Sequence, residues 1–191
     1  VYLYPIYEAE KFVSSFIAER CAASMPSAQQ DGLVAEVLAQ TERELNLRFS
    51  PEQREAVRLA VSTRLLIITG GPGCGKTTTI RALVTIFQKM GKALALAAPT
   101  GKAAQRMAQM CSYPASTIHR LLKFDPRSGC FKYGISAPLH IGEDEEQEAE
   151  AVIIDETSMV DILLARDLFS AIPHHAHLIL VGDKDQLPSV G

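Results

Sequence analysis

Residues 70–77 are GGPGCGKT. They follow the apolar run at 65–68 and precede the sequence TTI at 78–80. The pattern G-x-x-x-x-G-K-[ST] between a strand and a helix is typical of a loop that binds the phosphates of a nucleoside triphosphate. Glycines let the backbone curl so that its N–H groups point inward at phosphate oxygens, and the helix that follows adds the positive end of its dipole. Lys76 can reach the β- and γ-phosphates, and the Thr77 hydroxyl can ligate Mg²⁺.

The loop supplies most of the predicted nucleotide contacts. We interpret Cys74 as a small filler within it; the alternative is a redox-sensitive thiol, because a helix N-terminus lowers the pKa of a cysteine. The four cysteines of the chain lack C-x-x-C spacing, so we expect reduced thiols in a cytoplasmic protein. The contacts predicted from the loop are Gly71, Gly73, Cys74, Gly75, Lys76, Thr77 and Thr78.

The overall charge conceals an uneven distribution. The chain has 191 residues, 47% of them hydrophobic, and a net charge of −3. Six of its 22 acidic residues lie between 143 and 150; without them, 16 acids face 19 bases, a balance of +3. We interpret the acidic run as a solvated loop, so that the remaining surface can carry a local basic track. No apolar run is long enough to span a bilayer, and no membrane association is expected.

The order of the predicted elements favours an α/β fold. Helices alternate with short apolar strands, a pattern typical of a parallel sheet that is covered on both faces. Helices are predicted at 9–22, 31–47, 51–62, 76–90, 102–110, 116–122 and 157–171, and strands at 64–69, 92–98, 151–154 and 177–181.

Two carboxylates, Asp155 and Glu156, follow the strand predicted at 151–154. In proteins with a phosphate loop, an acid at such a strand end holds Mg²⁺, and a second one can polarise an attacking water. GTPases are excluded because no N-K-x-D pattern is present, so ATP hydrolysis coupled to motion fits best. Gln186 follows the last predicted strand, where parallel strands end at a ligand crevice. It is placed to sense a γ-phosphate, with a plain turn as the alternative.

Six segments in order carry a resemblance to a known family. Together they resemble superfamily-one helicases, specifically the 5′-to-3′ RecD-like branch of the exodeoxyribonuclease V alpha type, over almost all of residues 49–191. The opening sequence at 3–17 is similar to the segment that precedes the motor in stand-alone RecD-like helicases. The six segments are FSPEQREAV at 49–57, GGPGCGKTTT at 70–79, APTGKAAQRM at 98–107, STIHRLL at 116–122, VIIDETSMVD at 152–161 and LVGDKDQLPSVG at 180–191.

The resemblance implies roles for individual residues. Gln53 matches the glutamine that reads adenine, although its sequence context also predicts a capping box with Ser50. The implied catalytic residues are Lys76, Asp155, Glu156 and Gln186, and the implied Mg²⁺ ligands are Thr77 and Asp155. The implied contacts with single-stranded DNA are Pro99, Thr100, Gly101, Lys102, Thr117 and His119; for the last two, a buried capping role is the alternative.

Two further features remain open at this level. Turn residues and aromatic side chains predict a β-hairpin at about 123–141, where this family inserts a small pin that parts the duplex. Phe124, Phe131 and Tyr133 can stack on bases there or pack onto the domain. The histidines at 174, 175 and 177 lie close together in sequence, but no acid or cysteine completes a tetrahedral metal site nearby, and we interpret them as a loop that leads into a strand.

The resemblance also implies a domain organisation. We expect a first RecA-like P-loop NTPase domain at 49–191, preceded by a helical segment at 1–48 that ends an N-terminal domain. Helicases of this type carry a second RecA-like domain with an arginine finger, which contributes roughly 10³–10⁵ in rate. We therefore expect a fragment with very slow ATP hydrolysis, whose partners are ATP, Mg²⁺, single-stranded or duplex DNA and the missing domain of the same chain.

The implied process is DNA recombination or repair, with RecBC-like partners left open. Two alternatives also stay open. The chain can be the helicase region of a conjugative relaxase, or an ATP-gated DNA-binding module without translocation.

Overall fold

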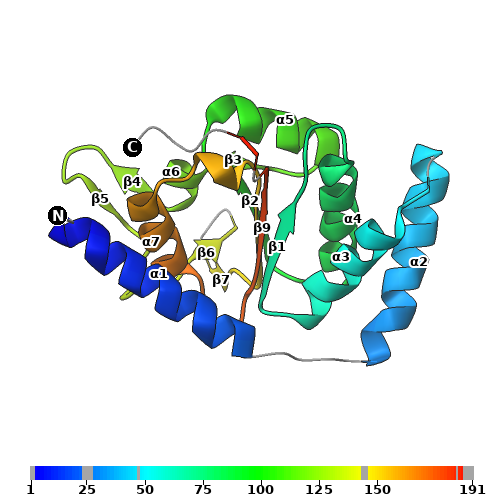
Figure 1. Ribbon diagram of the computed structural model, residues 1–191, viewed down its shortest axis with the longest axis horizontal. Coiled ribbons are helices and arrows are strands. Elements are labelled where there is room, and N and C mark those ends of the chain that lie inside the picture. Colours follow the sequence, from blue (N-terminus) through cyan, green and yellow to red (C-terminus); the bar gives the residue numbers. More distant parts are fainter. Residues whose placement is uncertain (1–2, 23–27, 47, 143–145, 184, 187–191) are drawn as a thin grey trace.

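A parallel sheet forms the centre of the molecule in the computed structural model, which describes residues 3–22, 28–46, 48–142, 146–183 and 185–186. Its five strands lie in the order β1-β9-β8-β2-β3, which confirms the predicted α/β class (Figure 1). Every residue of β2 and β8 is buried, as expected for a parallel sheet with both faces covered. The strands are β1 (Leu65–Thr69), β2 (Leu94–Ala98), β3 (Ser116–Thr117), β8 (Ala151–Ile154) and β9 (His177–Gly182).

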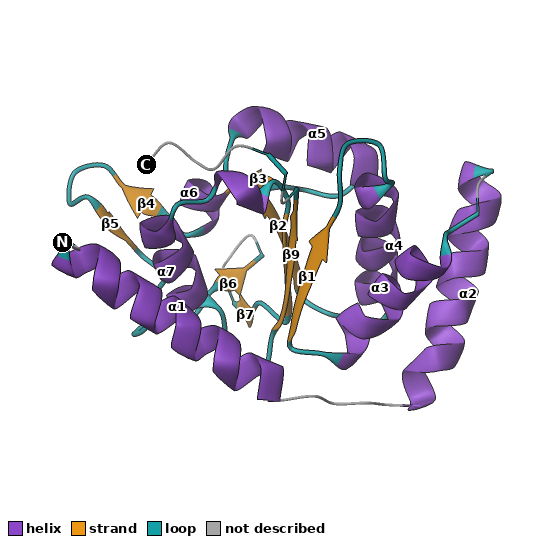
Figure 2. Ribbon diagram, viewed as in Figure 1, coloured by secondary structure: helices purple, strands orange, loops and turns teal. Residues whose placement is uncertain are grey.

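Side chains of the strands alternate between two hydrophobic cores, one on each face of the sheet. Leu96 and Ile153 belong to the first core, whereas their neighbours Ala95 and Val152 belong to the second, because successive strand residues point to opposite faces. Helices α2 (Ala28–Leu45), α3 (Pro51–Ser62), α4 (Lys76–Lys89) and α5 (Gly101–Cys111) cover the first core. Helices α1 (Tyr4–Ala22), α6 (Ile118–Leu121) and α7 (Ile162–Ala171) cover the second (Figure 2).

Side-chain caps set where several helices begin. Ser50 accepts a hydrogen bond from the Gln53 backbone N–H, and the Gln53 side chain accepts one from the Ser50 N–H, which completes the predicted capping box of α3. Thr100 caps α5 in a similar way, by accepting from the Ala103 N–H at 3.2 Å. These caps satisfy backbone donors that the first turn of a helix leaves without partners.

Two predicted helices differ from the structure. The helix predicted at 116–122 begins only after Thr117, because residues 116 and 117 pair with β2 as the edge strand β3. The helix predicted at 157–171 is divided into a 3-10 turn, η1 (Thr157–Met159), and α7. The division arises because Val160 is extended and the Asp161 carboxylate caps α7 by accepting from the Leu164 N–H at 2.8 Å.

The region predicted as one hairpin at 123–141 contains one complete antiparallel pair, and its last residues belong to a second pair that extends to residue 148. In the first, β4 (Phe124–Asp125) pairs with β5 (Cys130–Phe131), and in the second, β6 (His140–Ile141) pairs with β7 (Gln147–Glu148). The Asp125 carboxylate closes the first turn by accepting from the Arg127 N–H and the Ser128 hydroxyl. Gly129 follows with a φ of +69°, a conformation that glycine adopts without strain.

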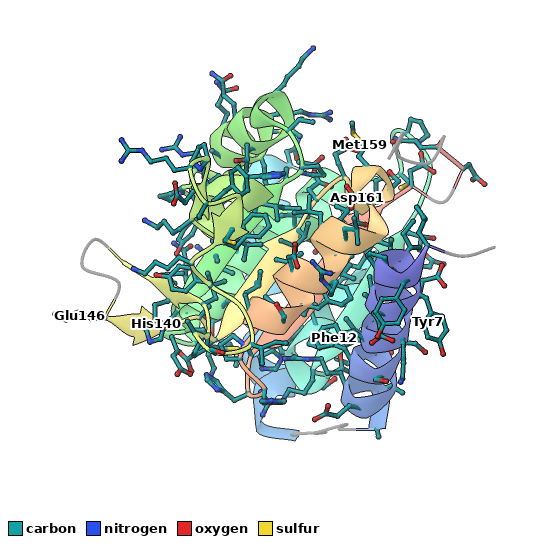
Figure 3. The ribbon with its side chains drawn as sticks, turned by 90° about the vertical axis from the view of Figure 1, so that its left-hand side faces the viewer. Tyr7, Phe12, His140, Glu146, Met159 and Asp161 are labelled. Atoms are coloured by element: carbon teal, nitrogen blue, oxygen red, sulfur yellow. The ribbon has the colours of Figure 1, made fainter. Side chains whose placement is uncertain are left out.

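The described part of the first 48 residues packs on the body of the sheet. Helix α2 packs against α3 and α4, and α1 lies alongside α7, as Figure 3 also shows. The rings of Phe16 on α1 and Phe169 on α7 stack with their centroids 4.7 Å apart. The boundary at residue 48 between a preceding domain and the RecA-like domain stays a prediction. None of the helices in the described ranges combines the length and apolar character that crossing a bilayer demands.

A buried arginine fastens the end of α1 to the sheet. Arg20 is 6% exposed, and its guanidinium lies 4.5 Å from the centroid of the Phe16 ring. It donates to the backbone oxygens of Ala176 at 2.6 Å and Pro173 at 2.7 Å, with longer contacts to those of Ile172 and Arg64. Burial lowers the pKa of Arg20 to about 10, so the side chain remains charged at neutral pH.

We predict that Arg20→Ala lowers the free energy of unfolding by about 2–4 kcal/mol, because the variant removes the guanidinium donors of the Ala176 and Pro173 oxygens and the packing of the side chain on Phe16. Arg20→Lys should recover only part of this loss, since an ammonium lacks the planar fork that reaches several carbonyls. Urea unfolding measures the change, with the exposed Lys11→Ala on the same helix as the control. An unchanged midpoint for Arg20→Ala would show that the Arg20 contacts add nothing to stability.

Candidate nucleotide-binding site

The loop between β1 and α4 has the backbone of an anion site. Gly73 and Gly75 adopt φ values of +77° and +81°, which residues with a Cβ rarely adopt. Gly75 occupies the N-cap position of α4, and no side chain caps that end of the helix. The first N–H groups of α4 therefore face the loop, where a phosphate can accept from them.

The side chain of Lys76 folds back over this loop. Its ammonium donates to the backbone oxygen of Gly70 and to that of Gly71 at 3.0 Å. These bonds hold the positive charge of Lys76 beside the first two glycines of the loop that is predicted to bind phosphates. Cys74 is exposed, and its sulfur lies 2.4 Å from the position that a Cβ on Gly70 would occupy. The thiol therefore fills space within the loop, in line with its interpretation as a filler.

Gln53 joins the start of α3 to the phosphate loop. Its amide oxygen accepts from the Ser50 N–H at 2.9 Å, while its amide nitrogen donates to the Gly75 oxygen at 3.2 Å. A Cβ on Gly75 would lie 2.3 Å from that nitrogen. One side chain therefore caps the helix and also contacts the loop. Beside it, a cavity of about 550 Å³ is lined by residues of α3, β1 and the loop, among them Ser50, Gln53, Leu66, Cys74 and Lys76.

The two predicted carboxylates lie at the carboxyl end of β8. The Asp155 carboxylate accepts from the Glu156 N–H at 2.9 Å. Burial raises the pKa of Asp155, and the positive charges of Arg106 and Lys76 oppose that rise. Strands β8 and β1 lie on either side of β9 in the parallel sheet, so Asp155 and the phosphate loop follow strands that end at the same edge. Glu156 has a φ of +55°, an uncommon backbone conformation for a residue other than glycine.

The predicted DNA contacts begin at the same edge of the sheet. Thr100 and Lys102 follow β2, and Lys102 is exposed at the start of α5. Thr117 caps α6 by accepting from the Arg120 N–H at 3.2 Å, so the capping alternative for this residue is realised. The ring of His119 lies against Phe124 and Phe131, with centroids 5.7 and 5.6 Å apart. The parallel strands thus deliver these residues and the phosphate loop to one side of the molecule.

The aromatic residues of the hairpin region separate into two groups. Tyr133 is 4% exposed and belongs to the second core, which answers the open alternative for this residue in favour of packing. Phe131 packs against the same core, whereas Phe124 is 39% exposed.

The three histidines make separate contacts: His174 with Glu19, His175 with Glu148 and His177 with the Thr63 oxygen. No cluster of three or more metal-ligating side chains occurs among the residues that the structure describes.

Sequence reasoning missed Arg106. This exposed side chain on α5 acts electrostatically on Asp155, although the helix starts at the predicted DNA contact Gly101. Its position four residues after Lys102 was the available signal, because residues i and i+4 lie on the same face of a helix.

We predict that Asp155→Asn increases the free energy of unfolding at pH 7. The folded state raises the pKa of Asp155, so the charged carboxylate destabilises the fold above that pKa, and this cost disappears as the pH falls toward the unfolded value. The gain from Asn should therefore be larger at pH 7 than at pH 4, as measured by urea unfolding at both values. A variant that is less stable than wild type at pH 7 would contradict the assignment of burial as the dominant cause.

Two curated proteins with similar sequences are RecD-type relatives. The ATP-dependent RecD2 DNA helicase of Deinococcus radiodurans is 35% identical over 190 residues, which cover 100% of this chain and 24% of that protein. The RecBCD enzyme subunit RecD of Mycobacterium tuberculosis is 36% identical over 162 residues, 73% of this chain and 27% of the subunit. The chain therefore spans about a quarter of the length of these relatives.

A solved structure shows the same fold. The crystal structure of Pif1 helicase from Candida albicans matches 76% of this chain and 34% of that protein, with a TM-score of 0.52 and 25% identity. The resemblance to RecD-like helicases and the RecA-like architecture are thus confirmed.

A family model described as AAA domain matches residues 53–191. The match covers most of the length of this chain and includes the phosphate loop and both carboxylates, Asp155 and Glu156. The chain therefore belongs to the AAA domain family.

Proposed function

We propose that this chain is the ATP-binding and ATP-hydrolysing motor domain of a 5′-to-3′ DNA helicase that acts in DNA recombination or repair. The observation that carries the proposal is the gathering of Lys76, Asp155 and the Thr100 cap at the carboxyl ends of parallel strands. A nucleotide site and a site for nucleic-acid phosphates then lie on one rigid sheet. The names of the relatives support DNA helicase activity, whereas the direction of movement and the biological process are proposed from the resemblance of the sequence motifs to RecD-like helicases.

In this proposal, the phosphates of ATP bind to the N–H groups of the loop and the start of α4, and Lys76 turns from the Gly70 and Gly71 oxygens to the β- and γ-phosphates. Gln53 contacts the adenine from the start of α3. Glu156 polarises the attacking water, and Gln186 responds to the γ-phosphate. The remaining proposed nucleotide contacts are Gly71, Gly73, Cys74, Gly75, Thr77 and Thr78.

The Thr77 hydroxyl and the Asp155 carboxylate fit a magnesium ion. Both are hard oxygen donors, and Mg²⁺ in nucleotide sites usually has one or two protein ligands together with phosphates and water. Asp155 is a half-buried carboxylate whose pKa is raised by that burial, so a cation at this position would relieve the cost of its charge. When bound, Mg²⁺ neutralises charge that develops on the phosphates.

DNA would pass along the start of α5. This helix end is a proposed binding site for a backbone phosphate. It offers backbone N–H groups, the Thr100 hydroxyl, Gly101 and the exposed Lys102. Pro99, Thr117 and His119 are proposed to line the same path. The partly exposed Phe124 in β4, which contacts His119, can stack on an unpaired base. A second RecA-like domain would face this edge of the sheet and supply an arginine finger.

In the full-length protein that carries this chain, we predict that Lys76→Ala lowers ATP turnover by about 10²-fold or more and abolishes unwinding, because a preorganised positive charge is lost from the phosphates. Binding of single-stranded DNA should survive. The matched control is Lys102→Ala, which should weaken single-strand binding and reduce its salt dependence while ATP binding is retained. Turnover, strand separation and fluorescence anisotropy measure the three effects. Retained unwinding in Lys76→Ala would refute the proposal, and ATP and DNA binding without unwinding in the wild type would favour an ATP-gated DNA-binding module.

We predict that Gln53→Glu weakens ATP binding by about tenfold, because it removes an amide donor while keeping an oxygen that accepts from Ser50. Both variants lose the bond to the Gly75 oxygen, but Gln53→Ala loses the cap as well, so this second variant should lower the melting temperature more. Nucleotide titration and thermal unfolding of both variants separate the two roles. Equal affinity for ATP in wild type and Gln53→Glu would leave Gln53 with the capping role alone.

A further inference from the structure

Three segments of the chain meet at Gly182, the last residue of β9. The Gly182 oxygen accepts from the N–H of Gly70, the first glycine of the phosphate loop, at 3.3 Å. A Cβ on Gly182 would lie 2.6 Å from the Thr157 hydroxyl oxygen and 3.3 Å from the Ser158 nitrogen. No residue larger than glycine fits here unless its neighbours move, so close approach explains the glycine at this position.

The turn that follows Asp155 and Glu156 is hydrogen-bonded to residues on either side of Gly182. Glu156 starts the turn in its left-handed conformation, and the next two residues each use a side-chain hydroxyl. Thr157 donates to the Val181 oxygen at 3.0 Å. Ser158 donates to the Gln186 amide oxygen at 3.3 Å. The residue proposed to activate water is therefore followed directly by contacts with β9 and with Gln186. In Figure 3 this turn lies above α7, near the labelled Met159 and Asp161.

The segment that carries Gln186 is itself folded into a tight turn. Asp183 is 3% exposed; its carboxylate accepts from the Asp185 N–H at 3.0 Å, and its backbone oxygen accepts from the Gln186 N–H at 3.3 Å. With the amide oxygen of Gln186 bound to Ser158, the amide nitrogen donates to none of the residues that the structure describes. A donor is the group that an anionic γ-phosphate requires.

We propose that Thr157 and Ser158 are positioning residues for ATP hydrolysis. They join the Glu156 turn to the Gln186 turn across Gly182, so that the water-activating carboxylate and the phosphate-sensing amide keep a fixed separation. Gly182 also accepts from the Gly70 N–H, which joins this contact point to the start of the phosphate loop. This inference rests on the proposed function, because it assigns Glu156 and Gln186 their roles in hydrolysis.

The first experiment measures ATP turnover in the protein that carries this chain. Ser158→Ala should lower kcat about three- to tenfold, the range expected for one lost hydrogen bond, with KM for ATP unchanged. Ser158→Thr keeps a hydroxyl and should recover most of the rate. The control is Ser170→Ala, which removes a hydroxyl that donates to the Asp167 oxygen on the remote part of α7. This control should turn over at the wild-type rate.

A double-mutant cycle separates positioning from a general structural effect. If Ser158 acts through Gln186, then Ser158→Ala should have no further effect on kcat in the Gln186→Ala background. A purely structural role would instead give the same fold-change in both backgrounds. A wild-type kcat for Ser158→Ala, or additivity with Gln186→Ala, would overturn the inference.

A second cycle tests the close contact at Gly182. Gly182→Ala should lower kcat more than Thr157→Ala does, because the added methyl group displaces the Thr157 hydroxyl. The double variant should be faster than Gly182→Ala alone, since removal of the hydroxyl makes room for the methyl group. If Gly182→Ala does not fold, the Ser158 series decides the matter.

Lys76→Ala in the same assay distinguishes the two levels of failure. If it turns over ATP at the wild-type rate, the proposed function fails and the inference falls with it. If Lys76→Ala and Gln186→Ala are both slow while Ser158→Ala behaves as wild type, the inference alone is wrong.

Discussion

The parallel pairing of β1 with β9 is the constraint on which the site depends. Leu65 lies opposite Leu178 and Thr69 opposite Gly182, so the two strands end at the same level. The Gly70 N–H extends this ladder by one bond into the Gly182 oxygen. Because parallel strands end on one side of a sheet, the phosphate loop, the carboxylate pair and the Gln186 turn emerge together. A register shift would separate them and would also exchange the core-facing and opposite-facing side chains.

The two cores hold this arrangement from opposite sides. On one face, α4 anchors the phosphate loop through buried side chains such as Ile80 and Phe87, with α2 and α3 packed behind it. On the other face, α7 supports the turn that follows Glu156, and α1 braces α7 through stacked phenylalanines and the Arg20 contacts. The site can therefore contain uncommon backbone conformations at Gly73, Gly75 and Glu156, because the elements that flank them are fixed by packing.

Local patterns predicted what short-range physics decides. The capping box at Ser50, the phosphate loop and the buried strand at 151–154 all appear in the structure at the predicted positions. One prediction failed where a long-range contact overrides local preference: residues 116 and 117 continue the sheet because they pair with β2. The helix predicted at 157–171 is divided by local features, the extended Val160 and the Asp161 cap, and Thr157 in its first turn also donates to β9.

The sequence by itself determined the class of fold, the phosphate loop and the pair of acids at a strand end, because these depend on residue types at short, fixed spacings. Only the tertiary structure decided which residues from separate segments share the site. It placed the Gln53 amide on the Gly75 oxygen, the Arg106 charge near Asp155, and Thr157 and Ser158 against Gly182 and Gln186. Contacts of this kind join segments roughly 20 to 50 residues apart, so they follow from strand order and packing, which no local sequence pattern records.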